Sequence, residues 1–172
     1  YSHLAAQRRY GATPGGALLT GFDSFREAAD AVVHGASDLA LLPIENTTAG
    51  SINEVYDLLA DGKLHITGEV ISAIEHCLLA LPGVTLDELR VVISHPQALA
   101  QCHAFFAQHG HLVARPELDT AGSARRVAQS GARTLAAIAS SAAAKTYGLA
   151  IVAQGIQSAA GNATRFVEIA LR

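Results

Sequence analysis

The chain has 172 residues, of which 50% are hydrophobic and 16% are charged, and its formal net charge is −3. This length and apolar content suffice for one good core or two small ones, as in a globular protein. The Lys and Arg residues form no basic stripe that would neutralise a phosphate backbone, so we expect no nucleic-acid partner.

The apolar runs are short and the cysteines are few. Gly, Pro or charged residues interrupt each run well before the roughly 20 residues that cross a bilayer, and no basic and then apolar signal segment opens the sequence. We therefore expect a cytoplasmic protein that makes no membrane contact. Cys77 and Cys102 have no paired spacing, which indicates neither a disulfide framework nor a cysteine-based zinc site. Both are expected to be buried as small hydrophobic residues.

The first predicted elements are a helix and a strand. Residues 24–35 carry Ser24 and Glu27 as a capping box, and Gly35 closes the helix that they predict. Residues 39–44, "LALLPI", are typical of a buried strand.

A second helix and a long extended segment follow. Ser51 and Glu54 form another apparent capping box and predict a helix that ends at Gly62. Residues 64–81 predict extended structure, although their middle part also fits a helix.

The remaining chain repeats the alternation after a short capped turn in "TLDELR". Pro96 is placed at the first turn of a helix, where its missing N–H costs nothing. Strands are predicted at 91–94, 111–114, 133–139, 149–153 and 164–171, and helices at 96–110, 119–131 and 140–148.

Alternating strands and helices predict an α/β fold with mostly parallel sheets and helices on both faces. The extended segment divides the elements into two small α/β lobes. We expect residues 1–80 plus 163–172 to form the first lobe and residues 81–162 the second. In open parallel sheets, ligands bind beyond the carboxyl ends of strands, so the strand-to-helix junctions are the places to look for chemistry.

Four such junctions carry polar side chains. Three of them would direct helix N-terminal amides at a cleft, and the fourth supplies a guanidinium, so the predicted ligand is a small anion, most simply a carboxylate. The residues are Glu45, Asn46, Thr47 and Thr48; Ser94 and His95, followed by Gln97 and Gln101 on one helix face; Asp119 and Thr120; and Thr164 with Arg165.

The common catalytic signatures are missing from the sequence. It contains no G-x-G-x-x-G, G-x-x-x-x-G-K-[ST], G-x-S-x-G or H-E-x-x-H pattern, so neither a nucleotide cofactor nor a serine-hydrolase triad is supported. His109 and His111 have a spacing that can hold a metal, but it is more typical of an exposed turn. We expect neither a metal nor a cofactor.

Six segments in order resemble the motifs of the prephenate dehydratase catalytic domain, across nearly the whole chain. They are "YSHLAAQRRYG", "LLPIENTTAGSINEVYDLL", "SHPQALAQC", "DTAGSA", "AAIASSAAAKTYGL" and "NATRFVEI". The resemblance implies a two-lobed fold like that of type II periplasmic binding proteins, with the substrate between the lobes. It also implies cofactor-free conversion of prephenate to phenylpyruvate, carbon dioxide and water, on the route to phenylalanine.

The resemblance implies a role for each candidate residue. Thr164 is expected to be catalytic, either as a proton relay or as an oriented donor to the leaving hydroxyl. The expected substrate-binding residues are Asn46, Thr47, Ser94, His95, Gln101, Thr120, Arg165 and Phe166.

Plainer interpretations of the same residues stay open. Asn46 and Thr47 could satisfy the backbone of a turn, Ser94 could cap a helix, and Thr120 could be only a helix-terminal residue. Arg165 could pair with Glu45, Phe166 could pack in the core, and His95 could be a hydrogen-bonding prop.

Three hypotheses follow for the whole chain. It could accept arogenate instead of prephenate, it could be a non-catalytic small-carboxylate binding module of the same fold, or it could be a ligand-sensing domain. Relatives normally begin with a strand and a glycine-rich turn before the Tyr1 helix, so the first lobe is expected to lack that strand. Many also continue into a phenylalanine-binding ACT domain, which we do not expect here. The resemblance further implies a homodimer or homotetramer.

Overall fold

The computed structural model describes residues 1–11 and 16–171, and these form two compact units. The first unit comprises Tyr1–Ala73 and Ala163–Arg172, and the second comprises Ile74–Asn162. Residues 74–80, which the sequence pattern assigned to the first lobe, lie in the second unit because they carry β4 (Cys77–Ala80), which pairs with β7 and β8 of its sheet. Arg172, the end of the expected range 163–172, lies outside the described residues.

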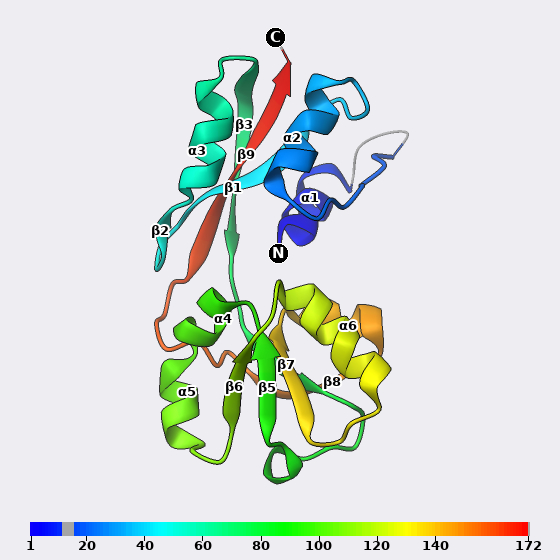
Figure 1. The fold of residues 1–172 in the computed structure, drawn as a ribbon, viewed down its shortest axis with the longest axis vertical. Coiled ribbons are helices and arrows are strands. Elements are labelled where there is room, and N and C mark those ends of the chain that lie inside the picture. Colours follow the sequence, from blue (N-terminus) through cyan, green and yellow to red (C-terminus); the bar gives the residue numbers. More distant parts are fainter. Residues whose placement is uncertain (12–15, 172) are drawn as a thin grey trace. The chain divides into compact units, whose positions relative to one another are not determined.

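The first unit is built on one four-stranded sheet with the order β2-β1-β9-β3 (Figure 1). Its elements are α1 (Ser2–Tyr10), α2 (Phe25–Val33), β1 (Ala40–Asn46), β2 (Gly50–Ser51), α3 (Asn53–Ala60), β3 (Leu64–Ala73) and β9 (Ala163–Leu171).

The second unit is built on a five-stranded sheet with the order β6-β5-β7-β4-β8. Its elements are β4 (Cys77–Ala80), the 3₁₀ turn η1 (Leu86–Glu88), β5 (Val91–Ser94), α4 (Pro96–Gln101), α5 (His103–Gln108), β6 (Val113–Pro116), α6 (Thr120–Ser130), β7 (Leu135–Ala139), α7 (Ser141–Tyr147) and β8 (Ala150–Gln154).

The α/β class is confirmed, but the expectation of mostly parallel pairing is wrong. In the first sheet β9 lies between β1 and β3 and runs antiparallel to both. In the second sheet β5 pairs in parallel with β6 and β7, whereas β4 lies between β7 and β8 and is antiparallel to both. Strands β1 and β3 therefore run in the same direction, as do β5, β6, β7 and β8, while β9 and β4 are inserted antiparallel to their neighbours. Strand β2 adds a further antiparallel pair because it forms a hairpin with β1.

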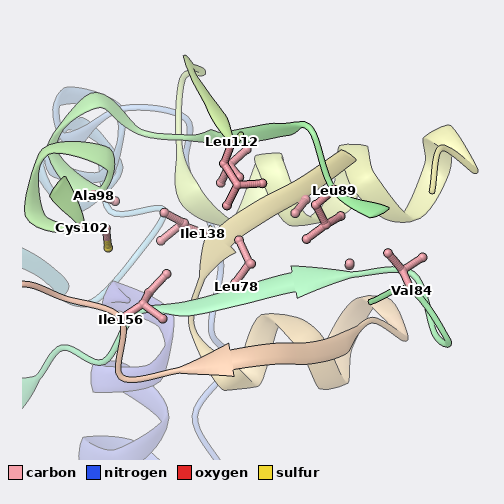
Figure 2. Packing of buried hydrophobic residues seen from close by; sticks show 11 residues of the cluster. Leu78, Val84, Leu89, Ala98, Cys102, Leu112, Ile138 and Ile156 are labelled. Atoms are coloured by element: carbon pink, nitrogen blue, oxygen red, sulfur yellow. The ribbon is translucent and has the colours of Figure 1, made fainter. Parts of the chain in front are cut away.

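Helices cover both faces of the second sheet, and the strand period of two explains how. Alternate strand residues such as Leu78 and Ile138 pack against Ala98 and Cys102 of the α4 region (Figure 2). Val92 of β5 belongs to the same cluster. Their neighbours Leu79, Ile93 and Ala137 pack on the other face against α6 and α7. Both cysteines are buried and unpaired in this core, as the sequence predicts.

The first sheet also has two covered faces. Leu42, Ile44 and Val167 pack on one face against Val32 of α2 and Val55 of α3. The opposite face carries the alternate residues of β9, and helix α1 is tied to that face.

The start of α3 corrects the second predicted capping box. Ser51 lies in β2 opposite Glu45, and Ile52 stands at the N-cap of α3 without a side-chain cap bond. The first capping position is confirmed, since Ser24 accepts a hydrogen bond from the Glu27 backbone amide. The Ser-x-x-Glu pattern therefore predicted the start of α2 correctly, whereas Ser51 pairs in a strand and caps no helix.

A hydrogen-bonded pair anchors α1 to β9 and predicts an alkaline stability limit. The Tyr10 hydroxyl donates to the Glu168 carboxylate, and burial together with this bond raises the pKa of Tyr10 to about 12. The unfolded chain releases this proton near the ordinary tyrosine pKa of about 10. The native state thus holds more protons between about pH 10 and 12, and this contribution to stability is lost as the pH rises.

We therefore expect the free energy of unfolding to fall across that window, and Tyr10→Phe to remove the part of the fall that Tyr10 causes. Urea titrations of both proteins from pH 8.5 upward measure the difference. Parallel curves for the two proteins would show that Tyr10 contributes nothing to the fall.

Candidate functional site

The predicted site residues fall into two groups, one in each unit. The first group lies at the end of β1 and the start of β9, and the second lies along one edge of the second sheet. Each group is built from hydrogen bonds within its own unit.

A buried polar row crosses the first sheet. Thr164 of β9 lies directly opposite Asn46 of β1 and Ser72 of β3, and opposed residues project from the same face. The three residues are exposed by only 8%, 6% and 4%. A shift of register in β1 between Pro43 and Glu45 precedes this row, and such irregularities re-aim the side chains that follow.

Asn46 connects the Thr164 hydroxyl to the turn after β1. Its Nδ2 donates to Thr164 Oγ1 at 2.9 Å and to the Ala163 carbonyl at 3.1 Å, while its Oδ1 accepts from the amides of Thr48 and Ala49, each at 3.0 Å. Because Oδ1 accepts two amide protons, the orientation of the side-chain amide is fixed. The turn interpretation of Asn46 is thus correct, and the same side chain also holds Thr164.

Thr47 belongs to this turn as well. Its backbone amide donates to the Ala163 carbonyl at 2.9 Å, and its hydroxyl accepts from the Ala163 amide at 3.0 Å. The side chain is exposed. Thr47 therefore continues the pairing of β1 with β9 by one step and keeps Thr164 in register with Asn46.

The Thr164 hydroxyl is held as an acceptor with its own proton directed elsewhere. A hydroxyl has one proton to donate and two lone pairs to accept with, and the Asn46 amide occupies one lone pair. Thr164 can therefore donate a hydrogen bond without giving up the bond that orients it.

Arg165 and Phe166 follow Thr164 but face different environments. The Arg165 side chain is 48% exposed and donates to Glu69 from Nε at 2.8 Å and Nη2 at 2.7 Å, and Nη1 lies 4.0 Å from Glu45. Hydrogen bonding to Glu69 raises the pKa of Arg165. Phe166 is only 1% exposed, so its ring packs in the core of the first unit.

The second group lies along the edge where β5, β6 and β7 end. These three strands are parallel, so their carboxyl ends share one edge, and β4 begins at the same edge because it pairs antiparallel with β7. This edge brings Ser94, His95, Thr120 and His76 to one side of the second unit.

The plainer interpretations made Ser94 a helix cap and His95 a hydrogen-bonding prop, but the structure exchanges these two roles. Ser94 is fully buried and donates to the Ile138 carbonyl at 2.7 Å, which ties β5 to β7. His95 is the exposed N-cap of α4, where its Nδ1 accepts from the Gln97 amide at 3.2 Å.

Gln101 is held by two donors that converge on one oxygen. His76 Nε2 lies 2.6 Å from Gln101 Oε1, and Asn162 Nδ2 donates to the same oxygen at 3.1 Å. Burial lowers the pKa of His76, which keeps its imidazole neutral at physiological pH. This contact gives His76 Nε2 the donor role and directs the amide nitrogen of Gln101 away from the pair.

Thr120 is the first residue of α6, and Asp119 is the cap of that helix. Asp119 Oδ1 accepts from the Gly122 amide at 2.6 Å, so a carboxylate already occupies this part of the helix N-terminus. Thr120 is half-buried. The interpretation of Thr120 as a helix-terminal residue agrees with this geometry.

The described residues gather no group of three or more His, Cys, Asp or Glu side chains able to hold a metal. Within the same ranges, no helix is long and apolar enough to span a membrane. His76, Ser72 and Asn162 contact the candidate residues but carried no recognisable sequence pattern, apart from their polarity within otherwise apolar or small-residue segments.

Comparisons with known proteins identify the family of this chain. The chain matches the family described as prephenate dehydratase over residues 1–172. Arogenate dehydratase 1 of Petunia hybrida is 51% identical over 149 residues, which are 86% of this chain and 35% of that protein. Among solved structures, prephenate dehydratase of Arthrobacter aurescens in complex with L-Phe has a TM-score of 0.90 and 28% identity, covering 99% of this chain and 57% of that one.

A structure described as GqqA, a novel type of quorum quenching acylase, has a TM-score of 0.84 and 37% identity, covering 100% of this chain and 60% of that one. The chain thus spans about a third of the plant relative and less than two thirds of either solved structure. The match over the full chain confirms the resemblance in its six motifs, and the protein belongs to the prephenate dehydratase family.

Proposed function

We propose that this chain converts prephenate to phenylpyruvate, carbon dioxide and water. The observation that carries the proposal is the buried Asn46–Thr164 bond, which joins the second and the sixth of the segments that resemble the family and leaves the Thr164 proton available. A fixed hydroxyl donor is what the departure of a ring hydroxyl requires.

The reaction needs little covalent chemistry from the protein. The bond between the ring and its carboxylate breaks, its electron pair enters the ring, and the ring hydroxyl departs with a proton as water. The prephenate dianion and one proton thus give the phenylpyruvate anion, carbon dioxide and water, and aromatisation drives both departures. The protein has to orient the dianion and assist the leaving oxygen.

Thr164 is proposed as the catalytic residue, with Asn46 as the residue that positions it. The Asn46 amide withdraws electron density from Oγ1 and fixes its direction, so the Thr164 proton is better presented to the leaving hydroxyl. Whether Thr164 then relays a proton or acts as a fixed dipole is distinguished by a solvent isotope effect on kcat, which only the relay requires.

The proposed substrate contacts follow the remaining candidates. Gln101 is proposed to donate from its amide nitrogen, because His76 and Asn162 occupy its oxygen. Ser94, His95, Thr47 and Thr120 complete the proposed polar set. Phe166 is proposed to shape the site by packing, and Arg165 would have to exchange its bond to Glu69 for a substrate carboxylate.

Arogenate is the second proposed substrate, because the plant relative carries that name. It differs from prephenate in having an amino group in place of the side-chain ketone, while the ring chemistry is the same. A cytoplasmic location and a homodimer or homotetramer complete the proposal. Cell fractionation and light scattering of the purified protein test these two points.

The test of function is incubation of the purified chain with each substrate near pH 8, with a protein-free control for spontaneous breakdown. We expect phenylpyruvate from prephenate, or phenylalanine from arogenate, at rates proportional to protein concentration. The ratio of the two kcat/KM values gives the preference. Tight binding without either product would support the non-catalytic binding module instead.

A further inference from the structure

Arg8 of helix α1 reaches the polar row that contains Thr164. Its Nη1 donates to the Ser72 hydroxyl at 3.3 Å, and Ser72 lies directly opposite Thr164 in the sheet. Opposed residues in antiparallel strands have Cβ atoms about 5 Å apart, so the Arg8 charge lies close to the proposed catalytic hydroxyl. Arg8 belongs to the first family motif but was not among the candidate residues.

Other cations near this row are already paired. Arg9, the next residue on α1, lies 3.7 Å from the Glu168 carboxylate, and Arg165 is paired with Glu69. Within residues 1–11 and 16–171, the Arg8 guanidinium contacts no carboxylate. Its side chain is exposed, and four of its five N–H donors have no partner among these residues.

The substrate proposed above brings two carboxylates to this row. A guanidinium binds a carboxylate with two parallel hydrogen bonds, and such bonds are about twice as strong as neutral ones. Arg165 could do the same only after breaking its bonds to Glu69, which would leave the Glu69 carboxylate without this partner. Arg8 needs no such exchange.

We infer that Arg8, and not Arg165, is the cation that binds a carboxylate of the substrate positioned at Thr164. The inference rests on the proposed function, because that function supplies the anion. Arg165 then serves to tie β9 to β3 through Glu69 and keeps the strand that carries Thr164 in place.

A purely structural role for Arg8 makes a different prediction. The bond to Ser72 could simply fasten α1 to β3, in which case loss of Arg8 would change stability and leave ligand affinity unaltered. Arg9→Gln is the matched control, since it removes the same charge from the same helix at a residue that already has a partner.

The test measures prephenate binding by calorimetry in Thr164→Ala protein, in which turnover is slow. We expect Arg8→Gln to weaken binding about 10- to 100-fold, Arg8→Lys to recover part of the loss, and Arg9→Gln to stay within about threefold. Affinity should also fall less steeply with added salt in Arg8→Gln than in Arg9→Gln, because one charge pair is missing.

Two results would overturn the inference. One is an Arg8→Gln affinity equal to that of Arg9→Gln, with urea unfolding showing both variants folded. The other is a large loss of affinity in Arg165→Gln with none in Arg8→Gln, which would place the carboxylate on Arg165. Failure of the proposed function looks different, because the unsubstituted protein would then form neither phenylpyruvate nor phenylalanine, whatever the variants bind.

Discussion

Replacing Thr164 with alanine is expected to lower kcat for prephenate by about 100- to 1,000-fold, the usual cost of removing one oriented donor from a developing charge. The KM should change much less, because the bond to the leaving oxygen strengthens only as that oxygen departs. Thr164 is buried and its hydroxyl is held by Asn46, so the substitution removes a donor whose position is fixed. Steady-state formation of phenylpyruvate measures both constants.

Three further variants identify the hydroxyl as the cause. Thr164→Ser keeps the hydroxyl and should retain much of the activity, whereas Thr164→Val keeps the shape and should be as slow as alanine. Asn46→Ala removes the residue that orients the hydroxyl, so its kcat should lie between those of Thr164→Ser and Thr164→Val. An undiminished kcat in Thr164→Ala would remove Thr164 from the mechanism.

Replacing Phe166 with alanine is expected to destabilise the protein by about 3–5 kcal/mol, the usual cost of deleting a buried aromatic side chain. Phe166 is the largest of the side chains that are almost wholly buried, and it lies between Pro43 of β1 and Val70 of β3. The cavity would open beneath α1, on the face that carries Thr164. Urea unfolding followed by circular dichroism measures the loss.

Phe166→Leu separates packing from substrate contact. Leucine fills much of the ring volume, so the variant should lose far less stability than alanine and keep a KM for prephenate close to that of the unsubstituted protein. A KM raised tenfold or more in a stable Phe166→Leu protein would show that the ring contacts the substrate, against the packing role.

The alternation of helices and strands could be predicted because each element carries its own periodicity and end signals. The insertion of β9 between β1 and β3, and of β4 between β7 and β8, could not. Both depend on pairing between distant segments, which no local pattern encodes. The strands predicted to be parallel, such as β1 and β3 or β7 and β8, do run in the same direction, but they are not neighbours in their sheets.

The apparent capping box at Ser51 shows the limit of short motifs. Its residues are those of a helix start, yet Ser51 pairs with Glu45 across a hairpin, and Gly50, the first residue after the turn, has a φ of 78°. A glycine followed by a serine, as at Gly50 and Ser51, is equally typical of a hairpin turn. The local sequence therefore does not distinguish a hairpin from a helix start.

The site could be predicted only in part, for a similar reason. The sequence placed Asn46 and Thr164 at element junctions, but their hydrogen bond joins positions 118 apart. Only the antiparallel register of β1 with β9 brings them together. Arg8, Ser72 and His76 remained unnoticed because a lone cation on a helix or a lone polar residue in an extended segment is usually unremarkable.

The most direct test of the central claim is the fate of the ring carboxylate. Prephenate labelled with carbon isotope at that position is incubated with the purified chain and with its Thr164→Ala variant, and labelled carbon dioxide is counted against phenylpyruvate. We expect equal amounts of the two products and a much lower rate in the variant. Prephenate recovered intact from a stable complex, with no labelled carbon dioxide above the protein-free control, would contradict it.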